Sequence, residues 1–292
     1  MKFIASTLIL LLSASLTLAD VRFESKKLED NIYTVFGAGG FTGGNHLLIS
    51  GDDGVILVDT SMPDYADMLI ATIDDLVDED EVDFLINTHL HADHVANNGF
   101  FADEGATIIA HQGTYDTLKN KGLVSGGGVS DAGENMLPHV VFSQSMTLYL
   151  NGLTIELSHI PNAHTLSDII VYIPEKNMIH VGDMLFNGIF PFIDLNNGGD
   201  VDGYIAGQKQ ILDMIDDETK VVAGHGPFAS KADLKKAHDM LVDARSIIAM
   251  HKNKGKSEDE VVEANPLKKY HDDWNWGFIT TERMTRQVYR GL

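Results

Sequence analysis

Strand-like and helix-like segments alternate in two successive halves of this 292-residue chain, and that order restricts its fold more than any other feature. In each half, short apolar runs separated by glycine-rich turns come first, and amphipathic segments of helical period follow. Chains of this kind fold as α/β domains in which helices cover the sheets. No low-complexity tract or charge block divides the chain. We therefore expect one α/β domain, residues 20–292, with two sheets packed between outer helices and a helical extension from about residue 229.

The predicted elements follow from apolar periodicity and turn residues. Asn151-Gly152 is a strong hairpin signal between two of the strands. Residues 122–137 carry five glycines and no clear period, so they predict a mobile loop. The predicted strands cover residues 32–36, 46–49, 55–58, 82–86, 106–110, 146–150, 153–159, 169–173, 178–181 and 220–223. The predicted helices cover residues 63–76, 114–119, 204–215, 231–251 and 257–263.

The first residues have the pattern of a secretory signal. A charged start precedes an apolar run from Phe3 to Leu18, and Ala19 offers a small residue at the cleavage position. An uncleaved membrane anchor is the alternative, but the run is shorter than the ~20 residues that a span requires. We expect residues 1–19 to be a signal peptide that is cut after Ala19, which places the mature chain in the periplasm or outside the cell without stable membrane insertion.

Charge and cysteine content narrow the function classes. The formal net charge of −22 becomes −23 if Lys2 leaves with the signal, and such a field repels nucleic acid and anionic lipid. The chain has no cysteine, so it contains neither disulfides nor thiolate ligands. Any metal must therefore be bound by histidines and carboxylates, and the expected partner is a small-molecule substrate. The oligomeric state is left open.

Four side chains able to bind a metal fall within six residues, at His89, His91, Asp93 and His94. They directly follow the predicted strand 82–86, so a loop and a helix start would display them. Imidazole and carboxylate ligands suit zinc, with iron and manganese as alternatives. A polar loop of solvated histidines is the other interpretation.

Three further candidate ligands stand at strand ends or in glycine turns, where active-site groups are often displayed. They are His164, Asp183 and His225. Taken singly, each is also explained as a solvated histidine or a turn residue. Their combination with the histidine run is what makes them informative.

The ordered series of all seven residues resembles the ligand set of the metallo-β-lactamase superfamily, over about residues 31–226. The resemblance implies a four-layer αββα sandwich, two mixed sheets between outer helices, with metals at one edge of the paired sheets. It also implies one zinc held by His89, His91 and His164, a second held by Asp93, His94 and His225, and Asp183 as a bridge between them. Asp59 matches a family aspartate that supports the ligands.

Such a site predicts an exported di-zinc metallohydrolase in which a metal-bridging hydroxide attacks an electrophilic carbonyl. Asp93 is the predicted catalytic residue, because it would orient the hydroxide and pass a proton to the leaving atom. A non-catalytic periplasmic zinc-binding protein is the remote alternative. An open bridging position favours catalysis, since structural zinc sites are closed.

The residue at position 183 bears on the substrate. Members of the family that resemble true β-lactamases usually carry Cys or Ser at this position. Many of them also have a lysine shortly after it, which holds the carboxylate of the antibiotic. In this chain Met184, Leu185 and Phe186 follow, so that lysine is absent. The charge argues against a nuclease and the signal against a cytoplasmic glyoxalase. We expect cleavage of an ester, lactone or amide-type bond of a small, partly apolar molecule, with dedicated β-lactam hydrolysis as the alternative.

Aromatic residues and one loop leave two interpretations each. Phe186, Phe190 and Phe192 are either an apolar wall beside the metals or ordinary core. The loop 122–137 is either a lid or a plain surface loop. The C-terminal aromatic residues either cap a pocket or pin the tail, and they are Trp274, Trp276 and Phe278.

Overall fold

The computed structural model describes residues 21–77, 81–125 and 128–292, and the predicted signal peptide, residues 1–19, lies outside these ranges. Two sheets form the centre of the molecule, with seven and five strands. The seven-stranded sheet has the order β1 (Arg22–Glu29), β2 (Ile32–Ala38), β3 (His46–Ile49), β4 (Ile56–Val58), β5 (Phe84–Asn87), β6 (Thr107–His111), β9 (Val140–Phe142). The five-stranded sheet has the order β10 (Ser145–Leu150), β11 (Leu153–His159), β12 (Ile169–Ile173), β13 (Met178–His180), β14 (Lys220–Val222).

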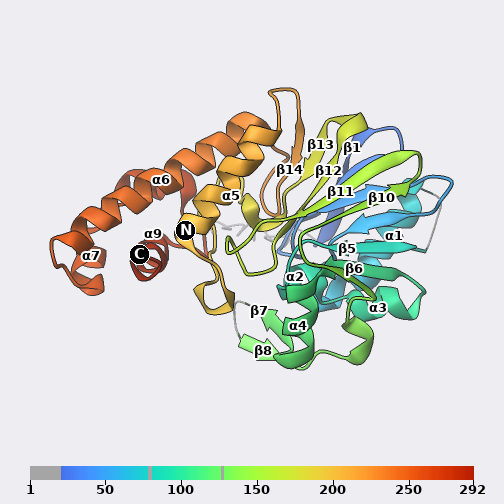
Figure 1. Cartoon of the computed structure of the whole chain (residues 1–292), viewed down its shortest axis with the longest axis horizontal. Helices are drawn as coiled ribbons and strands as arrows, with labels where there is room; N and C mark the ends of the chain where they lie inside the picture. Colours follow the sequence, from blue (N-terminus) through green and yellow to red (C-terminus); the bar gives the residue numbers. More distant parts are fainter. Residues whose placement is uncertain (1–20, 78–80, 126–127) are drawn as a thin grey trace, which may run out of the picture.

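Helices lie outside both sheets (Figure 1). No helix in the described part of the chain combines the length and the apolar character needed to cross a bilayer. The helices are α1 (Ala66–Val77), α2 (Ala92–Val95), α3 (Asn98–Asp103), α4 (Gln112–Asn120), α5 (Val201–Met214), α6 (Lys231–Asn253), α7 (Glu258–Ala264), α8 (His271–Trp274) and α9 (Thr281–Arg290).

Three apolar layers hold the sandwich together. One lies between the two sheets and includes Val58 and Ile169. A second packs α1 and α3 on the outer face of the seven-stranded sheet, where Leu69 meets residues such as Leu57. The third packs α5, α6 and α9 against the outer face of the five-stranded sheet, around Tyr204. This order of helix, sheet, sheet and helix confirms the predicted four-layer fold.

Both sheets are mixed, which is also as predicted. The β4–β5, β5–β6, β6–β9 and β13–β14 pairs are parallel, and the other pairs are antiparallel. Side chains alternate between the faces of a strand. Along β12, Ile169 and Val171 face the other sheet while Ile170 faces the helices. The sequence of β12 is therefore continuously apolar.

The β10–β11 hairpin confirms the turn predicted at Asn151-Gly152. Leu150 pairs with Leu153, so Asn151 and Gly152 alone form the turn. Both have a positive φ, 54° for Asn151 and 69° for Gly152. Two left-handed residues in a row are what a two-residue hairpin of this type requires.

The prediction for residues 122–137 is partly wrong. This stretch contains a small antiparallel ladder of β7 (Leu123–Ser125) and β8 (Gly128–Ser130), followed by a 3-10 turn over Glu134–Met136. Strands of three residues with glycine at one end leave too short a pattern to recognise in the sequence.

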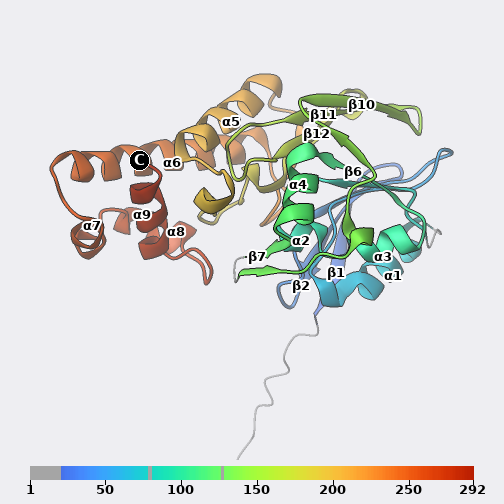
Figure 2. The same ribbon diagram turned by 60° about the horizontal axis from the view of Figure 1, so that its bottom comes forward.

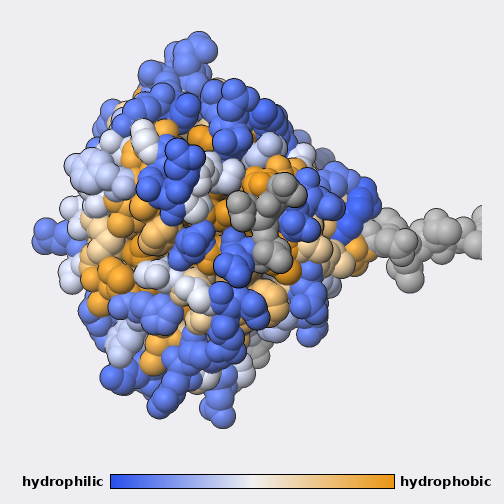
Figure 3. All heavy atoms as spheres, turned by 90° about the vertical axis from the view of Figure 1, so that its right-hand side faces the viewer, coloured by the Kyte–Doolittle hydropathy of each residue, from blue (hydrophilic) through white to orange (hydrophobic). Residues whose placement is uncertain are grey.

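The C-terminal helices α6 to α9 extend to one side of the sandwich (Figures 1 and 2). Their inner faces belong to the apolar layer around Tyr204, through residues such as Leu241 and Met284. On the end of the molecule away from them, hydrophilic side chains are spread over the surface with smaller apolar areas between (Figure 3).

Candidate metal centre

The ends of several strands meet at one edge of the sandwich, and the seven predicted ligands lie there. In the seven-stranded sheet, the parallel strands β4 and β5 end just before Asp59 and the histidine run. In the five-stranded sheet, β11, β13 and β14 point in one direction, because β12 is antiparallel to both β11 and β13. The loops that follow these three strands carry His164, Asp183 and His225.

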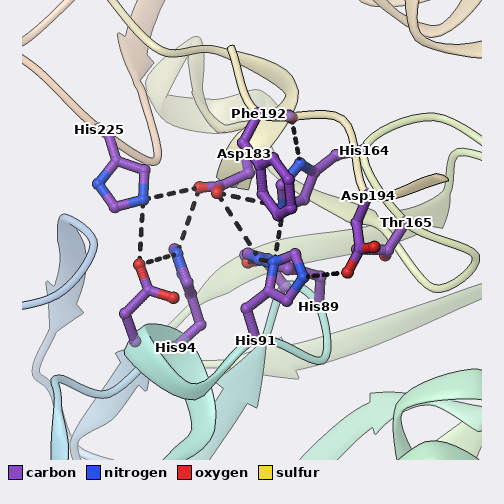
Figure 4. A network of polar contacts seen from close by, with 12 residues as sticks. His89, His91, His94, His164, Thr165, Asp183, Phe192, Asp194 and His225 are labelled. Carbon is purple, nitrogen blue, oxygen red and sulfur yellow. Dashed lines mark hydrogen bonds and ion pairs between the residues drawn. The ribbon is translucent and has the colours of Figure 1, made fainter. Parts of the chain in front are cut away.

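The first group of ligand atoms comprises His89, His91, His164 and one oxygen of Asp183 (Figure 4). The Nδ1 atom of His91 lies 3.1 Å from Nε2 of His89 and 2.8 Å from Nε2 of His164. The Oδ2 atom of Asp183 lies 3.3 Å from Nε2 of His164 and 3.7 Å from Nε2 of His89. These four buried side chains thus turn one atom each toward a common point.

The second group comprises Asp93, His94 and His225, and it faces the other oxygen of Asp183 (Figure 4). The Oδ1 atom of Asp183 lies 3.2 Å from Nε2 of His94 and 3.4 Å from Nε2 of His225. The Oδ2 atom of Asp93 lies 3.5 Å and 3.2 Å from the same two nitrogens. All seven residues singled out in the sequence are therefore brought together, and Asp183 lies between the two groups.

The donor set fits divalent cations. Ligand atoms of a tetrahedral site with ~2.0–2.1 Å bonds lie about 3.3 Å apart, which is close to the spacings within both groups. The buried Nε2 of His94 and Oδ1 of Asp183 form no hydrogen bond with the described residues. Unpartnered buried polar atoms are costly unless something else binds them. Histidine and carboxylate atoms in this arrangement are suited to divalent metal ions.

Outer contacts fix the orientation of the rings in the first group. His91 donates from Nε2 to Asp194 at 2.9 Å, and His164 donates from Nδ1 to the carbonyl oxygen of Phe192 at 2.7 Å. His89 bonds through Nδ1 to the hydroxyl of Thr88 at 3.1 Å. Such contacts fix which ring nitrogen is left free for a metal.

Asp59 supports both groups, as the family resemblance implied. It accepts from Nδ1 of His94 at 2.8 Å, and from the amide and hydroxyl of Thr88 at 2.7 Å each. Its backbone is left-handed, with φ of 63°, which is uncommon for a residue other than glycine. Its carboxylate is held by these three hydrogen bonds, two from Thr88 after β5 and one from His94 in α2.

Sequence reasoning did not find Asp194 and Thr88. Asp194 lies in a loop between β13 and α5, distant in sequence from His91, and only the folding of that loop brings it near. Thr88 directly precedes the histidine run, so its position was an available signal for a supporting role.

Two glycines allow the strand ends to approach this closely. A Cβ on Gly224 would lie 2.1 Å from Oδ1 of Asp183, and one on Gly44 would lie 2.3 Å from Cε1 of His94. Neither position has room for a side chain. The two glycines therefore permit the packing that places Asp183 and His94 side by side.

Burial and mutual charge set the protonation of the site. Burial alone would raise the pKa of Asp183, but the surrounding histidines, led by His225, hold it well below its usual range. Burial also lowers the pKa of His164 to about 4. By contrast, Asp183 and Asp93 outweigh the burial of His225 and raise its pKa to about 9. The carboxylates are thus anionic at neutral pH, and His164 is neutral. His225 carries a proton at that pH, which a metal ion would have to displace on binding.

A pocket of about 700 Å³ opens onto the centre. Asp93, Asp183, His91 and His225 form its polar part. Its remaining wall is mainly apolar and includes Phe41, Met62, Ala92, Ser125, Phe186, Phe192, Trp276 and Phe278.

The pocket lining shows which of the aromatic residues with two interpretations lie beside the metal centre and which belong to the core. Phe186 and Phe192 line it, whereas Phe190 is a core residue. Trp276 and Phe278 also line it, and the indole nitrogen of Trp276 donates to the carbonyl oxygen of Phe190 at 2.9 Å. Trp274 instead packs in the core of the C-terminal helices. Phe41, exposed beside the stacked ring of His225, was missed because it lies in a glycine-rich turn.

Comparisons with known proteins agree with this geometry. The model of the metallo-beta-lactamase superfamily matches residues 39–226. The chain is 24% identical over 208 residues to a metallo-beta-lactamase type 2 of Bacteroides fragilis, covering 69% of this chain and 78% of that protein. It is 25% identical over 143 residues to the alpha subunit of a 2,4-dinitroanisole O-demethylase of a Nocardioides strain, covering 49% of this chain and 41% of that protein.

Solved structures with the same fold include several metallo-beta-lactamases. One from Pontibacter korlensis superposes with a TM-score of 0.63 at 17% identity, over 75% of this chain and 99% of that one. The metallo-beta-lactamase DIM-1 gives 0.62 at 19% identity, over 77% and 100%. A double mutant of the sec-alkyl sulfatase PisA1 gives 0.67 at 16% identity, over 92% of this chain and 50% of that one.

The family model spans both groups of ligand atoms, from before the histidine run to just past His225. The solved structures share the arrangement of sheets and helices that brings those groups to one edge. The chain belongs to the metallo-beta-lactamase superfamily of metal-dependent hydrolases.

Proposed function

We propose that this protein is a hydrolase that uses two divalent metal ions to cleave an ester, lactone or amide-type bond of a small, partly apolar molecule. The position of Asp183 carries the proposal. Its Oδ2 atom lies 3.3 Å from Nε2 of His164, and its Oδ1 atom lies 3.2 Å from Nε2 of His94. A carboxylate with one oxygen toward each ligand group is suited to bridging two cations.

His89, His91 and His164 would hold one ion, Asp93, His94 and His225 the other, and Asp183 both. Zinc is the expected metal, with iron and manganese as alternatives, since imidazole and carboxylate ligands serve all three. When bound, such ions supply Lewis acidity, which polarises a scissile carbonyl and lowers the pKa of an attacking water. No side chain of the protein then has to act as the nucleophile.

Asp93 is the proposed catalytic residue. Its side chain is 19% exposed, so it is reachable from the pocket, and its carboxylate is anionic because nearby histidines outweigh its burial and lower its pKa. As the water oxygen bonds to the carbonyl carbon, Asp93 would accept the water proton. It would return that proton to the oxygen or nitrogen that leaves as the scissile bond breaks.

The pocket wall indicates the kind of substrate. None of the described residues that line the pocket is a lysine or arginine. The guanidinium of Arg283 packs on two of the lining rings, 4.1 Å from the centroid of Phe278 and 5.3 Å from that of Phe192, and donates to the carbonyl oxygen of Phe278. Trp276, Phe278, Phe192 and Phe186 instead offer aromatic faces within reach of the centre. An uncharged substrate with a bulky apolar part fits this lining.

Dedicated β-lactam hydrolysis is the second candidate function, because the relative from Bacteroides fragilis is a metallo-beta-lactamase. The pocket lining has no lysine or arginine to bind the carboxylate of a β-lactam antibiotic, and this disfavours β-lactam hydrolysis. The same test includes sulfate esters, since the structural likeness to the sec-alkyl sulfatase extends over 92% of this chain. The lack of a lysine or arginine in the pocket lining makes an anionic sulfate a poorer fit.

The test is metal analysis of the purified protein coupled to a hydrolysis panel of lactones, aryl esters, thioesters, β-lactams and alkyl sulfates. We expect two metal ions per chain and the highest kcat/KM on an uncharged ester or lactone. His91→Ala should remove about one metal and abolish turnover. Full activity in that variant, or hydrolysis of β-lactams alone, would contradict the proposal.

We also propose that the protein is exported, on the basis of the apolar run from Phe3 to Leu18. The mass of the mature protein recovered from its native host should correspond to a chain that starts at Asp20. A mature protein that keeps residues 1–19 would contradict this.

A further inference from the structure

Gln287 in α9 is buried, and its side-chain amide forms hydrogen bonds with the backbone of a loop near the metal centre. Its Nε2 donates to the carbonyl oxygen of Pro191 at 2.7 Å, and its Oε1 accepts from the amide of Ile193 at 3.3 Å. One side chain thus binds the backbone on both sides of Phe192. Gln287 lies beyond the stretch, residues 39–226, that the family model matches.

This loop, residues 191–194, carries two of the groups that orient the histidines of the first ligand group. The carbonyl oxygen of Phe192 accepts from Nδ1 of His164 at 2.7 Å, and Asp194 accepts from Nε2 of His91 at 2.9 Å (Figure 4). The amide of Asp194 in turn donates to the carbonyl oxygen of His164 at 2.9 Å.

The planarity of the peptide bond connects Gln287 to His164. The carbonyl of Phe192 and the amide of Ile193 belong to one peptide unit, so they cannot rotate independently. When Gln287 fixes the direction of the Ile193 amide, it also fixes the direction in which the Phe192 carbonyl points. That carbonyl sets the ring orientation of His164.

We infer that Gln287 is a positioning residue for the metal held by His89, His91 and His164, and that α9 is therefore part of the functional unit. The inference rests on the proposed metal centre. In the second ligand group, His94 is instead oriented by Asp59, which follows β4 of the seven-stranded sheet. Loss of the two Gln287 hydrogen bonds should thus weaken the binding of one metal and leave the binding of the other unchanged.

Neighbouring contacts keep α9 in place when the Gln287 amide is removed. Met284 and Val288 are buried in the core of the C-terminal helices, and the hydroxyl of Thr280 caps the helix by accepting from the amide of Arg283. The guanidinium of Arg283 lies 4.1 Å from the ring centroid of Phe278. A Gln287→Leu variant, of similar volume, should therefore fold.

The experiment measures both zinc dissociation constants of the full-length mature protein by competition with a chromophoric chelator. Gln287→Leu should weaken one site by about 10–100-fold, the usual effect of losing an outer support, and leave the other unchanged. Thr285→Val is the matched control, since it removes a buried hydrogen bond within the same helix, from Thr285 to the carbonyl oxygen of Thr281. It should alter neither constant.

Two single-site backgrounds identify the affected metal. In His225→Ala protein, Gln287→Leu should still weaken the remaining zinc, whereas in His91→Ala protein it should have no effect. Gln287→Met provides a second variant if the leucine variant does not fold. Unchanged constants in a folded Gln287 variant, or equal weakening of both sites, would overturn the inference. A wild-type protein that binds no zinc would instead overturn the proposed metal centre.

Discussion

Asp183 is the residue on which the two halves of the centre depend. It is buried, its two oxygens face different ligand groups, and Gly224 packs so closely that a Cβ there would lie 2.1 Å from Oδ1. A side chain held this tightly cannot turn away to serve one group alone. The packing therefore supports the bridging role that we propose for it, as does the nature of its oxygens.

Replacing Asp183 with asparagine tests that role. The amide keeps the volume of the carboxylate but loses the negative charge and one acceptor oxygen. Both metals should therefore bind more weakly, each by at least the roughly 10–100-fold that loss of an outer support costs. Zinc titration of Asp183→Asn measures both constants. Loss of affinity at one site only would show that Asp183 does not bridge.

Trp276 is predicted to govern which substrates fit. Trp276→Ala opens the aromatic wall, so kcat/KM should fall about tenfold or more for an ester with a bulky apolar acyl group. An acetyl ester, which does not reach the wall, should be affected little. Tyr149→Ala is the control, because Tyr149 is 78% exposed on the edge strand β10. Equal loss on both esters would argue that Trp276 has no part in selecting the substrate.

The sequence reveals the ligands better than their supports. His89, His91, Asp93 and His94 are close together in the chain, and a compact run of ligand types is visible without a structure. Asp194 and the carbonyl of Phe192 are recognisable only once the chain has folded, since a backbone carbonyl has no signature in the sequence. Gln287 is more remote still, because it acts on that carbonyl through the peptide unit between Phe192 and Ile193.

At the scale of elements, most strands with an apolar pattern were predicted, and strands without one were missed. The apolar strand β9 was also missed, because it is only three residues long. β11 and β12 were found with their bounds, Leu153–His159 and Ile169–Ile173, because both carry apolar residues on the core face. β1 was missed because Phe23 is its one buried residue and, apart from Leu28, the rest is charged or polar. An edge strand needs only one neighbour and little apolar surface.

Two strand ends are joined by a pair of stacked histidines. His111, at the end of β6, and His159, at the end of β11, lie 3.8 Å apart between ring centroids, at an angle of 14°. Each also bonds to a backbone carbonyl oxygen, His111 to Ser143 and His159 to Leu166. The contact connects the seven-stranded sheet to the five-stranded sheet beside the metal edge.

This pair should make the fold sensitive to acid. Burial lowers the pKa of both histidines, so in the folded state they resist protonation that the unfolded chain accepts below about pH 6.5. Stability is therefore retained above that pH and lost as the pH falls below it. In denaturant titrations from pH 7.5 to 5, His159→Phe should lose less unfolding free energy than the wild type. An identical pH slope would contradict this role.

At the scale of the whole molecule, the C-terminal helices complete a site that the sandwich begins. Trp276 and Phe278 supply part of the pocket wall, and Gln287 binds the loop beneath it. The helical period of the predicted extension from about residue 229 does not indicate this, because it reports only that one face is apolar. The sequence pointed to the pocket only through the open alternative that the C-terminal aromatic residues cap one. Which pocket that face adjoins is decided by the packing of α9 against α6.

Metal removal should destabilise the whole fold, since the ligands come from both sheets. Binding adds about 2.7 kcal/mol per site when free zinc is 100 times its dissociation constant. The midpoint of thermal unfolding should therefore fall on treatment with a chelator and recover when zinc is restored. Asp183→Asn protein should respond less to added zinc, and equal midpoints with and without metal would contradict the account.

The central claim is that two cations bind on either side of Asp183. Diffraction from crystals of the zinc-loaded protein, recorded at the zinc absorption edge, tests it most directly. We predict two anomalous peaks, one among His89, His91 and His164 and the other among Asp93, His94 and His225, each adjoining one oxygen of Asp183. A single peak, or two peaks that Asp183 does not join, would contradict the account.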